Sequence, residues 1–246
     1  MRDALVLGNL AYGNFKYTEA VHFYSGAQEI DPAAALAANI PIRLVRSHYH
    51  GIKSGEFTLD ELATSAEAIL QTENSEPHQV LEIADRLVRA ARYVDDPSYA
   101  SPYLVKALEL TADESEPDII ERRSNLVPLY ALIVEGDAAK AMETRKQLLP
   151  VDWENDPKQL NRMAWWCFEN RVNLAKAEEF ARKAVQKSQD ETKKANCLDT
   201  LAEILNARGN AAAALETMEQ AIALDPKNDY YQKQLEKFKK AETKES

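Results

Sequence analysis

The chain carries one spaced pattern twice, as LGNLAYGNFKYTEAVHFYSGAQEIDP at residues 7–32 and as LAEILNARGNAAAALETMEQAIALDP at residues 201–226. In the first copy, Ala20, Tyr24, Ala27 and Pro32 are separated by four, three and five residues. The second copy repeats these separations at Ala214, Met218, Ala221 and Pro226. Residues three and four apart share one face of an α-helix, and a proline cannot continue a helix. The pattern therefore predicts helical hairpins packed side by side.

The same alternation of four and three recurs between the two copies, at Ala100, Leu104 and Ala107, and at Ala177, Ala181 and Ala184. Turn signals divide the chain into about six hairpins. We predict that the second hairpin pairs a helix at about 32–53 with one at about 58–73, and that Pro128 kinks or splits its helix. A last helix at about 230–241 is expected to cover the exposed end of the array. Residues 1–246 are thus predicted to form one all-α domain, a single right-handed α-solenoid.

This spacing of small and large residues resembles the tetratricopeptide repeat, a family of helical hairpins. The resemblance is good in the first and last hairpins, moderate in the fourth and fifth, and rests on analogy at residues 33–112. A second resemblance covers residues 156–238, where LNRMAWWCFEN at 160–170 and LDTLAEI at 198–204 are similar to helical tails of bacterial thioredoxin-like proteins. The chain lacks the C-x-x-C pair of those proteins, so this resemblance implies no redox activity.

The composition favours a soluble helical protein. The chain has 246 residues with 7 glycines, and a formal net charge of −10. An acidic balance of this size argues against nucleic acid as a partner. Its start has no apolar signal core and no run is long enough to span a membrane, so we expect a cytoplasmic protein; a fragment of an exported protein would look the same.

No sequence pattern points to catalysis, to a cofactor or to a metal, and we expect a protein that is not an enzyme. Cys167 and Cys197 form no paired motif and are predicted to be buried, reduced thiols. His48 and His50 are two residues apart, so on a helix they point to different sides.

In the tetratricopeptide family the first helix of each hairpin lines a concave groove. We place the stripe of side chains that faces this groove by the alanine register, the four-and-three spacing of small residues given above. It gives candidate peptide-binding residues in four hairpins: Asn9, Tyr12, Arg89, Arg92, Arg123, Leu126, Tyr130, Ile133, Arg162 and Trp166. The sixth hairpin contributes Asn196, Asp199, Glu203 and Asn206 to the same stripe. Trp166 would instead be a core residue if the register slips by one position.

Arginine binds carboxylates through paired hydrogen bonds, and aromatic side chains supply apolar anchors. The candidate stripe therefore predicts non-catalytic binding of a protein or peptide with an acidic or C-terminal carboxylate and one apolar anchor. The family's clamp for chaperone tails needs a lysine where Leu5 stands, so chaperone-tail binding is not expected. Two alternatives stay open: an accessory module of a thioredoxin-like or envelope-associated redox protein, and self-assembly into a homo-oligomer.

Overall fold

The computed structural model describes the backbone of residues 1–71 and 75–245, and their side chains as far as residue 239. Within these ranges every regular element is a helix and no strand occurs, which confirms the all-α prediction. The chain forms two compact units, Met1–Asp137 and Ala138–Ser246. The single solenoid over the whole chain stays a prediction.

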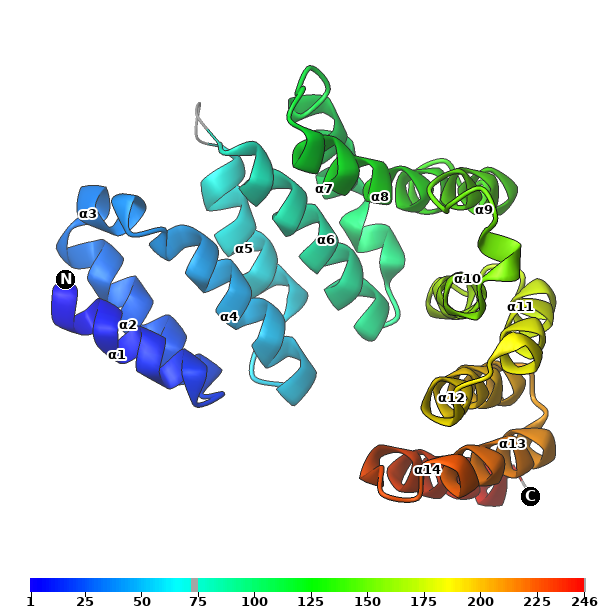
Figure 1. The fold of residues 1–246 in the computed structure, drawn as a ribbon. Coiled ribbons are helices and arrows are strands. Elements are labelled where there is room, and N and C mark those ends of the chain that lie inside the picture. Colours follow the sequence, from blue (N-terminus) through cyan, green and yellow to red (C-terminus); the bar gives the residue numbers. More distant parts are fainter. Residues whose placement is uncertain (72–74, 246) are drawn as a thin grey trace. The chain divides into compact units, whose positions relative to one another are not determined.

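The N-terminal unit is built from helices that pack on their neighbours in chain order (Figure 1). α1 packs on α2, α2 on α4, α4 on α5 and α6, and α6 on α7 and α8. The elements are α1 (Arg2–Gly13), α2 (Tyr17–Ile30), α3 (Pro32–Ala37), α4 (Ile40–Ser54), α5 (Leu59–Leu70), α6 (Pro77–Tyr93), η1 (Pro97–Ala100), α7 (Ser101–Leu110) and α8 (Pro117–Ile133). Three of the predicted hairpins are present here, as α1–α2, α4–α5 and α6–α7, and α8 continues through Pro128 without splitting. The predicted fourth hairpin begins with α8 and ends beyond Asp137, in the second unit, so its pairing stays a prediction.

The predicted second hairpin differs from the structure in its first helix. Residues 32–53 form two helices, α3 and α4, separated by Asn39 in the left-handed region at φ 56°. Pro41 accounts for the break, because it has no N–H to donate and its ring would clash with a preceding carbonyl. α5 begins as predicted after Thr58, whose backbone N–H donates to Glu61 Oε2 at 2.8 Å in a capping box. The predicted end of this helix near Glu73 lies outside the described residues.

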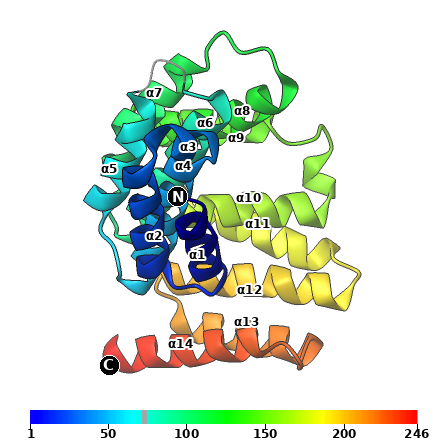
Figure 2. The same cartoon turned by 90° about the vertical axis from the view of Figure 1, so that its left-hand side faces the viewer.

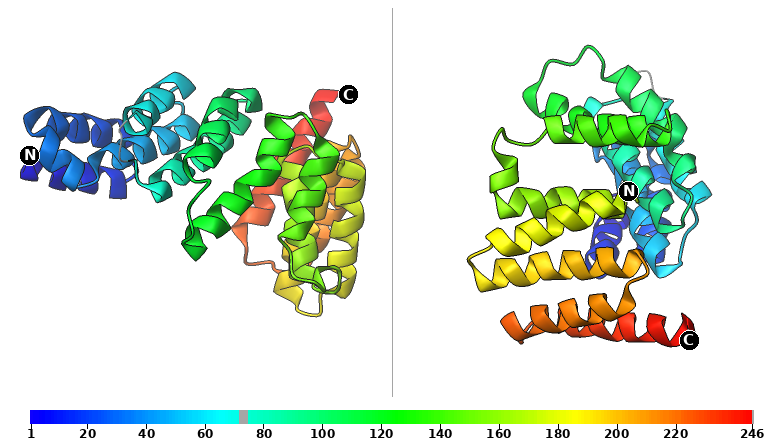
Figure 3. Two further views of the ribbon diagram at one scale, coloured as in Figure 1. Left: turned by 90° about the horizontal axis from the view of Figure 1, so that it is seen from above. Right: turned by 90° about the vertical axis from the view of Figure 1, so that its right-hand side faces the viewer.

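The C-terminal unit is a second stack, in which α10 packs on α11 and α12, α11 on α12, α12 on α13, and α13 on α14 (Figures 2 and 3). Its elements are α9 (Ala138–Gln147), η2 (Trp153–Asn155), α10 (Pro157–Glu169), α11 (Leu174–Lys187), α12 (Glu191–Ala207), α13 (Ala211–Leu224) and α14 (Asp229–Glu245). α14 is the predicted terminal helix, and it buries Tyr231, Leu235 and Phe238.

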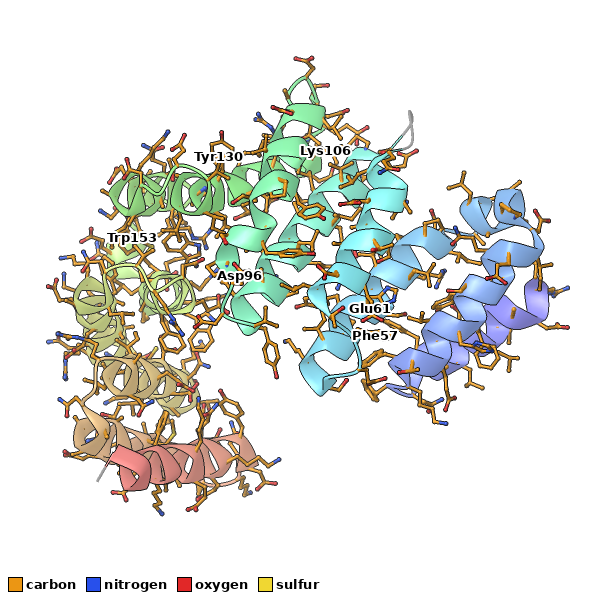
Figure 4. All side chains as sticks on the ribbon, turned by 180° about the vertical axis from the view of Figure 1, so that it is seen from behind. Phe57, Glu61, Asp96, Lys106, Tyr130 and Trp153 are labelled. Atoms are coloured by element: carbon orange, nitrogen blue, oxygen red, sulfur yellow. The ribbon has the colours of Figure 1, made fainter. Side chains whose placement is uncertain are left out.

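The alanine register marks the core of both units. The members of the four predicted sets are all no more than 1% exposed: Ala20, Tyr24, Ala27, Ala100, Leu104, Ala107, Ala177, Ala181, Ala184, Ala214, Met218 and Ala221. Larger side chains fill the space between helices, as where the ring of Trp153 (Figure 4) lies 5.3 Å from that of Phe180 on α11. The register read from the sequence is therefore confirmed.

The close packing of Gly8 on α1 against Tyr24 on α2 leads to a prediction about stability. A Cβ added at Gly8 of α1 would lie 2.5 Å from Cε1 of Tyr24, whose ring is buried and whose hydroxyl donates to Asn9 Oδ1 at 2.8 Å. We expect Gly8→Ala to lower the free energy of unfolding by about 2 kcal/mol through overpacking. Gly26→Ala on α2 is the matched control, because its added Cβ meets nothing within 4 Å and alanine favours a helix by about 1 kcal/mol. Equal urea midpoints for Gly8→Ala and the parent protein would contradict the packing of α1 on α2.

Candidate functional site

The first helices of successive hairpins are neighbours within each unit. In the N-terminal unit α4 packs on α6 and α6 on α8, and in the C-terminal unit α10 packs on α12. Side chains on these helices therefore gather on one surface per unit.

A charged network joins α4 to α6. The guanidinium of Arg46 donates two hydrogen bonds to the carboxylate of Glu82, each at 2.8 Å, and Arg86 Nε donates to Glu82 Oε1 at 2.8 Å. Burial alone would raise the pKa of Glu82, but the hydrogen bonds from both arginines outweigh it and hold the pKa at about 2. Arg86 also lies 4.9 Å from the ring centroid of Tyr49. The carboxylate is therefore a structural link between two hairpins.

The two candidate residues of α1 already have partners inside the protein. Asn9 Oδ1 accepts from Tyr24 Oη at 2.8 Å and from Arg43 Nη1 at 3.0 Å. The ring of Tyr12 lies edge-on to that of His50, with 5.8 Å between centroids. Burial lowers the pKa of His50, and the positive charges of Arg86 and Lys53 lower it further, so this imidazole is neutral at pH 7.

The candidate arginines are not equivalent. Arg89 donates to both oxygens of Asp85, at 3.0 and 2.8 Å, and Arg92 Nε donates to the carbonyl of Val88 at 3.4 Å. Arg162 is exposed. The Nε of half-buried Arg123 is buried and has no hydrogen-bond partner among the described residues. Among the candidate arginines, Arg123 is therefore the one whose unpaired Nε–H donor a bound ligand would satisfy.

The apolar candidates divide into buried and half-exposed residues. Leu126 is 3% exposed and Trp166 is 9% exposed, so both lie in the packing of their units. Tyr130, labelled in Figure 4, and Ile133 are half-buried on α8. A helical stripe gives only the direction of each side chain, and burial also depends on which helix lies beside it.

The C-terminal unit carries a polar set on α10, α12 and α14. Asn161 Nδ2 donates to Asn196 Oδ1 at 3.0 Å, and Lys237 Nζ lies 2.8 and 3.1 Å from the two oxygens of Glu203. Asp199 is 5% exposed; burial raises its pKa to about 7, and Glu203 contributes to the rise. The sequence pattern of the sixth hairpin predicted that Asp199 and Glu203 lie on one side of their helix. Their proximity to Lys237 could not be predicted, because it depends on how α14 packs.

Other reactive side chains are few among the described residues. The cysteines are buried, as predicted; burial raises the pKa of Cys167 to about 12 and raises that of Cys197. His78 Nδ1 lies 3.4 Å from Asp118 Oδ2, and Glu116 brings a third ligand atom within 4.8 Å of both. This group is solvent-exposed at the positive N-terminal ends of α6 and α8, which disfavours a cation. Within residues 1–71 and 75–245 no helix combines the length and apolar character needed to cross a membrane.

No family model matches the chain, and no curated protein matches it by sequence. Solved structures similar to the chain share little sequence identity with it, as three of them illustrate. BtubC (BKLC) from P. vanneervenii is 15% identical with a TM-score of 0.46, and the match covers 85% of this chain and 87% of that one. The TPR2AB domain of yeast Sti1 in complex with pHSP90 is 15% identical with a TM-score of 0.36, covering 96% of both chains. A tetratricopeptide repeat protein from Parabacteroides merdae is 14% identical with a TM-score of 0.35, covering 96% of this chain and 98% of that one.

Proposed function

We propose that this protein is a non-catalytic scaffold that binds a protein or peptide through the first helices of its hairpins. The observation that carries the proposal is the set of α8 side chains Arg123, Tyr130 and Ile133. Arg123 has an unsatisfied donor, and the two others are half-buried apolar side chains on the same helix. A guanidinium beside an aromatic anchor is complementary to a carboxylate next to an apolar residue.

The remaining candidates have other roles in this proposal. Leu126 and Trp166 support the surface from within the core, because both are buried. Asn9 and Arg89 are held by neighbouring side chains, which fixes their positions before a partner arrives and lowers the entropy lost on binding. Tyr12, Arg92 and Arg162 stay predicted contacts.

The proposal is tested by presenting a library of peptides with free C-terminal carboxylates to the immobilised full chain. For a selected peptide we expect Arg123→Gln and Tyr130→Ala each to weaken binding about tenfold or more. Amidation of the peptide's C-terminus should have an effect similar to that of Arg123→Gln. The neighbouring Arg122→Gln is the matched control, because Arg122 is exposed and lies 4.0 Å from Asp118.

Isothermal titration gives the affinities, and circular dichroism confirms that helix content is unchanged. Arg123→Gln and Tyr130→Ala variants that bind the selected peptide as tightly as the parent protein would contradict the proposed site. A peptide whose amide and free acid bind equally would contradict the carboxylate specificity.

A further inference from the structure

The middle helix of the C-terminal unit buries two carboxylates on one face. In α12 each residue from Cys197 to Leu205 is buried, and Asp199 and Glu203 are each 5% exposed. They are four residues apart, so their side chains lie on adjacent turns of the same side. Charged groups buried to this extent are normally paired and hydrogen-bonded.

Only one of the two carboxylates has a partner among the described residues. The ammonium of Lys237 on α14 contacts both oxygens of Glu203. Asp199 receives no hydrogen bond from the described part of the chain, and its Oδ1 is buried without a donor. Two carboxylates thus share one positive charge.

The amide side chains on the flanking helices add acceptors to this region. Asn161 on α10 donates from its nitrogen to Asn196, one turn before Asp199, while Asn161 Oδ1 accepts no hydrogen bond from the described residues. Gln234 on α14 donates from its nitrogen to Tyr230 Oη at 2.6 Å, while Gln234 Oε1 likewise has no donor within the described part of the chain. The unsatisfied atoms on all three helices are therefore acceptors, and a complementary ligand must donate several hydrogen bonds.

Long, partly exposed side chains cover this region on the α14 side. The side chain of Lys237 is 57% exposed, and Tyr230 is 46% exposed. Tyr230 belongs to the same environment, because burial and then the charge of Asp199 raise its pKa. A rotamer change of these two partly exposed side chains would open a route for a group from solvent to Asp199.

We propose that Asp199 and Glu203 form a binding site for an arginine side chain of a protein partner. The guanidinium supplies the missing positive charge and up to five donors in a planar fork, which suits a carboxylate flanked by amide oxygens. A divalent metal fits less well, because Lys237 already neutralises Glu203 and leaves a single carboxylate as ligand. This site lies in the C-terminal unit and does not depend on the α8 site proposed above.

The charged groups near Asp199 determine its protonation, and arginine binding should therefore change that protonation. Glu203 on its own helix and burial favour the protonated acid, whereas Lys237 on α14 favours the carboxylate; Tyr230 and Tyr231 are the other titratable groups on α14 near it. An added guanidinium acts in the same direction as Lys237. Arginine binding should therefore release a proton from Asp199 near neutral pH.

The probe is the peptide acetyl-Gly-Arg-Gly-amide, compared with the same peptide containing citrulline, which is nearly isosteric and uncharged. We expect the arginine peptide to bind saturably to the full chain. The binding is measured by NMR from the side-chain amide signals of Asn161 and Asn196. The citrulline peptide and the Asp199→Asn variant should each weaken binding about tenfold or more. Asp85→Asn in the N-terminal unit is the matched control and should leave binding unchanged.

Equal binding of the two peptides, no saturable binding of the arginine peptide, or undiminished binding by Asp199→Asn would each overturn the proposal. Calcium chloride is titrated separately. Saturable calcium binding that Asp199→Asn abolishes, without arginine binding, would replace the proposed ligand by a metal ion. Arg123→Gln should leave the arginine peptide's binding intact, so failure of the α8 site and failure of this site can be told apart.

Discussion

Replacing Glu82 with glutamine is expected to lower the free energy of unfolding by about 3 kcal/mol, the lower end of the cost of breaking a buried ion pair. The carboxylate connects Arg46 on α4 to Arg86 on α6. Its side chain and that of Arg86 are each 19% exposed, whereas that of Arg46 is 40% exposed, so solvent offsets part of the loss. Without Glu82, two guanidinium groups are left without their carboxylate at the contact between two hairpins.

The sign of the pH dependence follows from the lowered pKa of Glu82. Its folded-state pKa of about 2 lies below its usual 4.5. The stability that Glu82 contributes is therefore fully present above pH 4.5 and is lost as the pH falls toward 2. Glu82→Gln should lack this part of the acid destabilisation. Urea unfolding between pH 2.5 and 7 measures it, with Asp85→Asn as the control, since its exposed ion pair with Arg89 should contribute about 0.5 kcal/mol.

Asp199→Asn is expected to act in the opposite direction and to stabilise the C-terminal unit at pH 8. The folded-state pKa of Asp199 is about 7, above its ordinary value of 3.8. The contribution of the protonated acid is fully present below about pH 4 and is lost as the pH rises through about 7. Asparagine cannot ionise, so it avoids this loss, and we expect a gain of about 4 kcal/mol at pH 8.

Tryptophan fluorescence suits this measurement, because all three tryptophans, at 153, 165 and 166, belong to the C-terminal unit. The parent protein should lose stability between pH 4 and 7, and the Asp199→Asn variant should not. Glu219→Gln, an exposed change on α13, should follow the parent protein. An Asp199→Asn variant with the parent's pH profile would show that Asp199 is not a buried acid.

Local spacing was enough to predict the helices and their core. In four hairpins the core residues, mostly alanines, repeat at intervals of four and three residues, a spacing that depends only on the geometry of the α-helix. The break at Asn39 was missed, although Pro41 was visible, because the apolar pattern of residues 32–53 is continuous. The burial of Leu126 and Trp166 depends on which helices flank α8 and α10, and a single helix's pattern does not contain that information.

The charged contacts were the least accessible from the sequence. Glu82 and its partner Arg46 are separated by 36 residues, and Glu203 and Lys237 by 34. Each pair joins two helices that are not consecutive in the chain, α4 to α6 and α12 to α14, so the contact follows from tertiary structure and not from local spacing. The same reasoning separates Arg123, which has an unsatisfied donor, from Arg89, which pairs within its own helix. The sequence placed both on one stripe and could not distinguish them.

Photo-crosslinking on α8 tests most directly whether the first helices bind a partner. In one variant p-benzoyl-phenylalanine replaces Ile133, and in a second it replaces Ile120, which is 47% exposed on another side of the same helix. Each is irradiated with the selected carboxylate peptide. We predict a covalent adduct at position 133 that excess unlabelled peptide abolishes, and none at position 120. Equal adducts at both positions, or an adduct at position 120 alone, would contradict it.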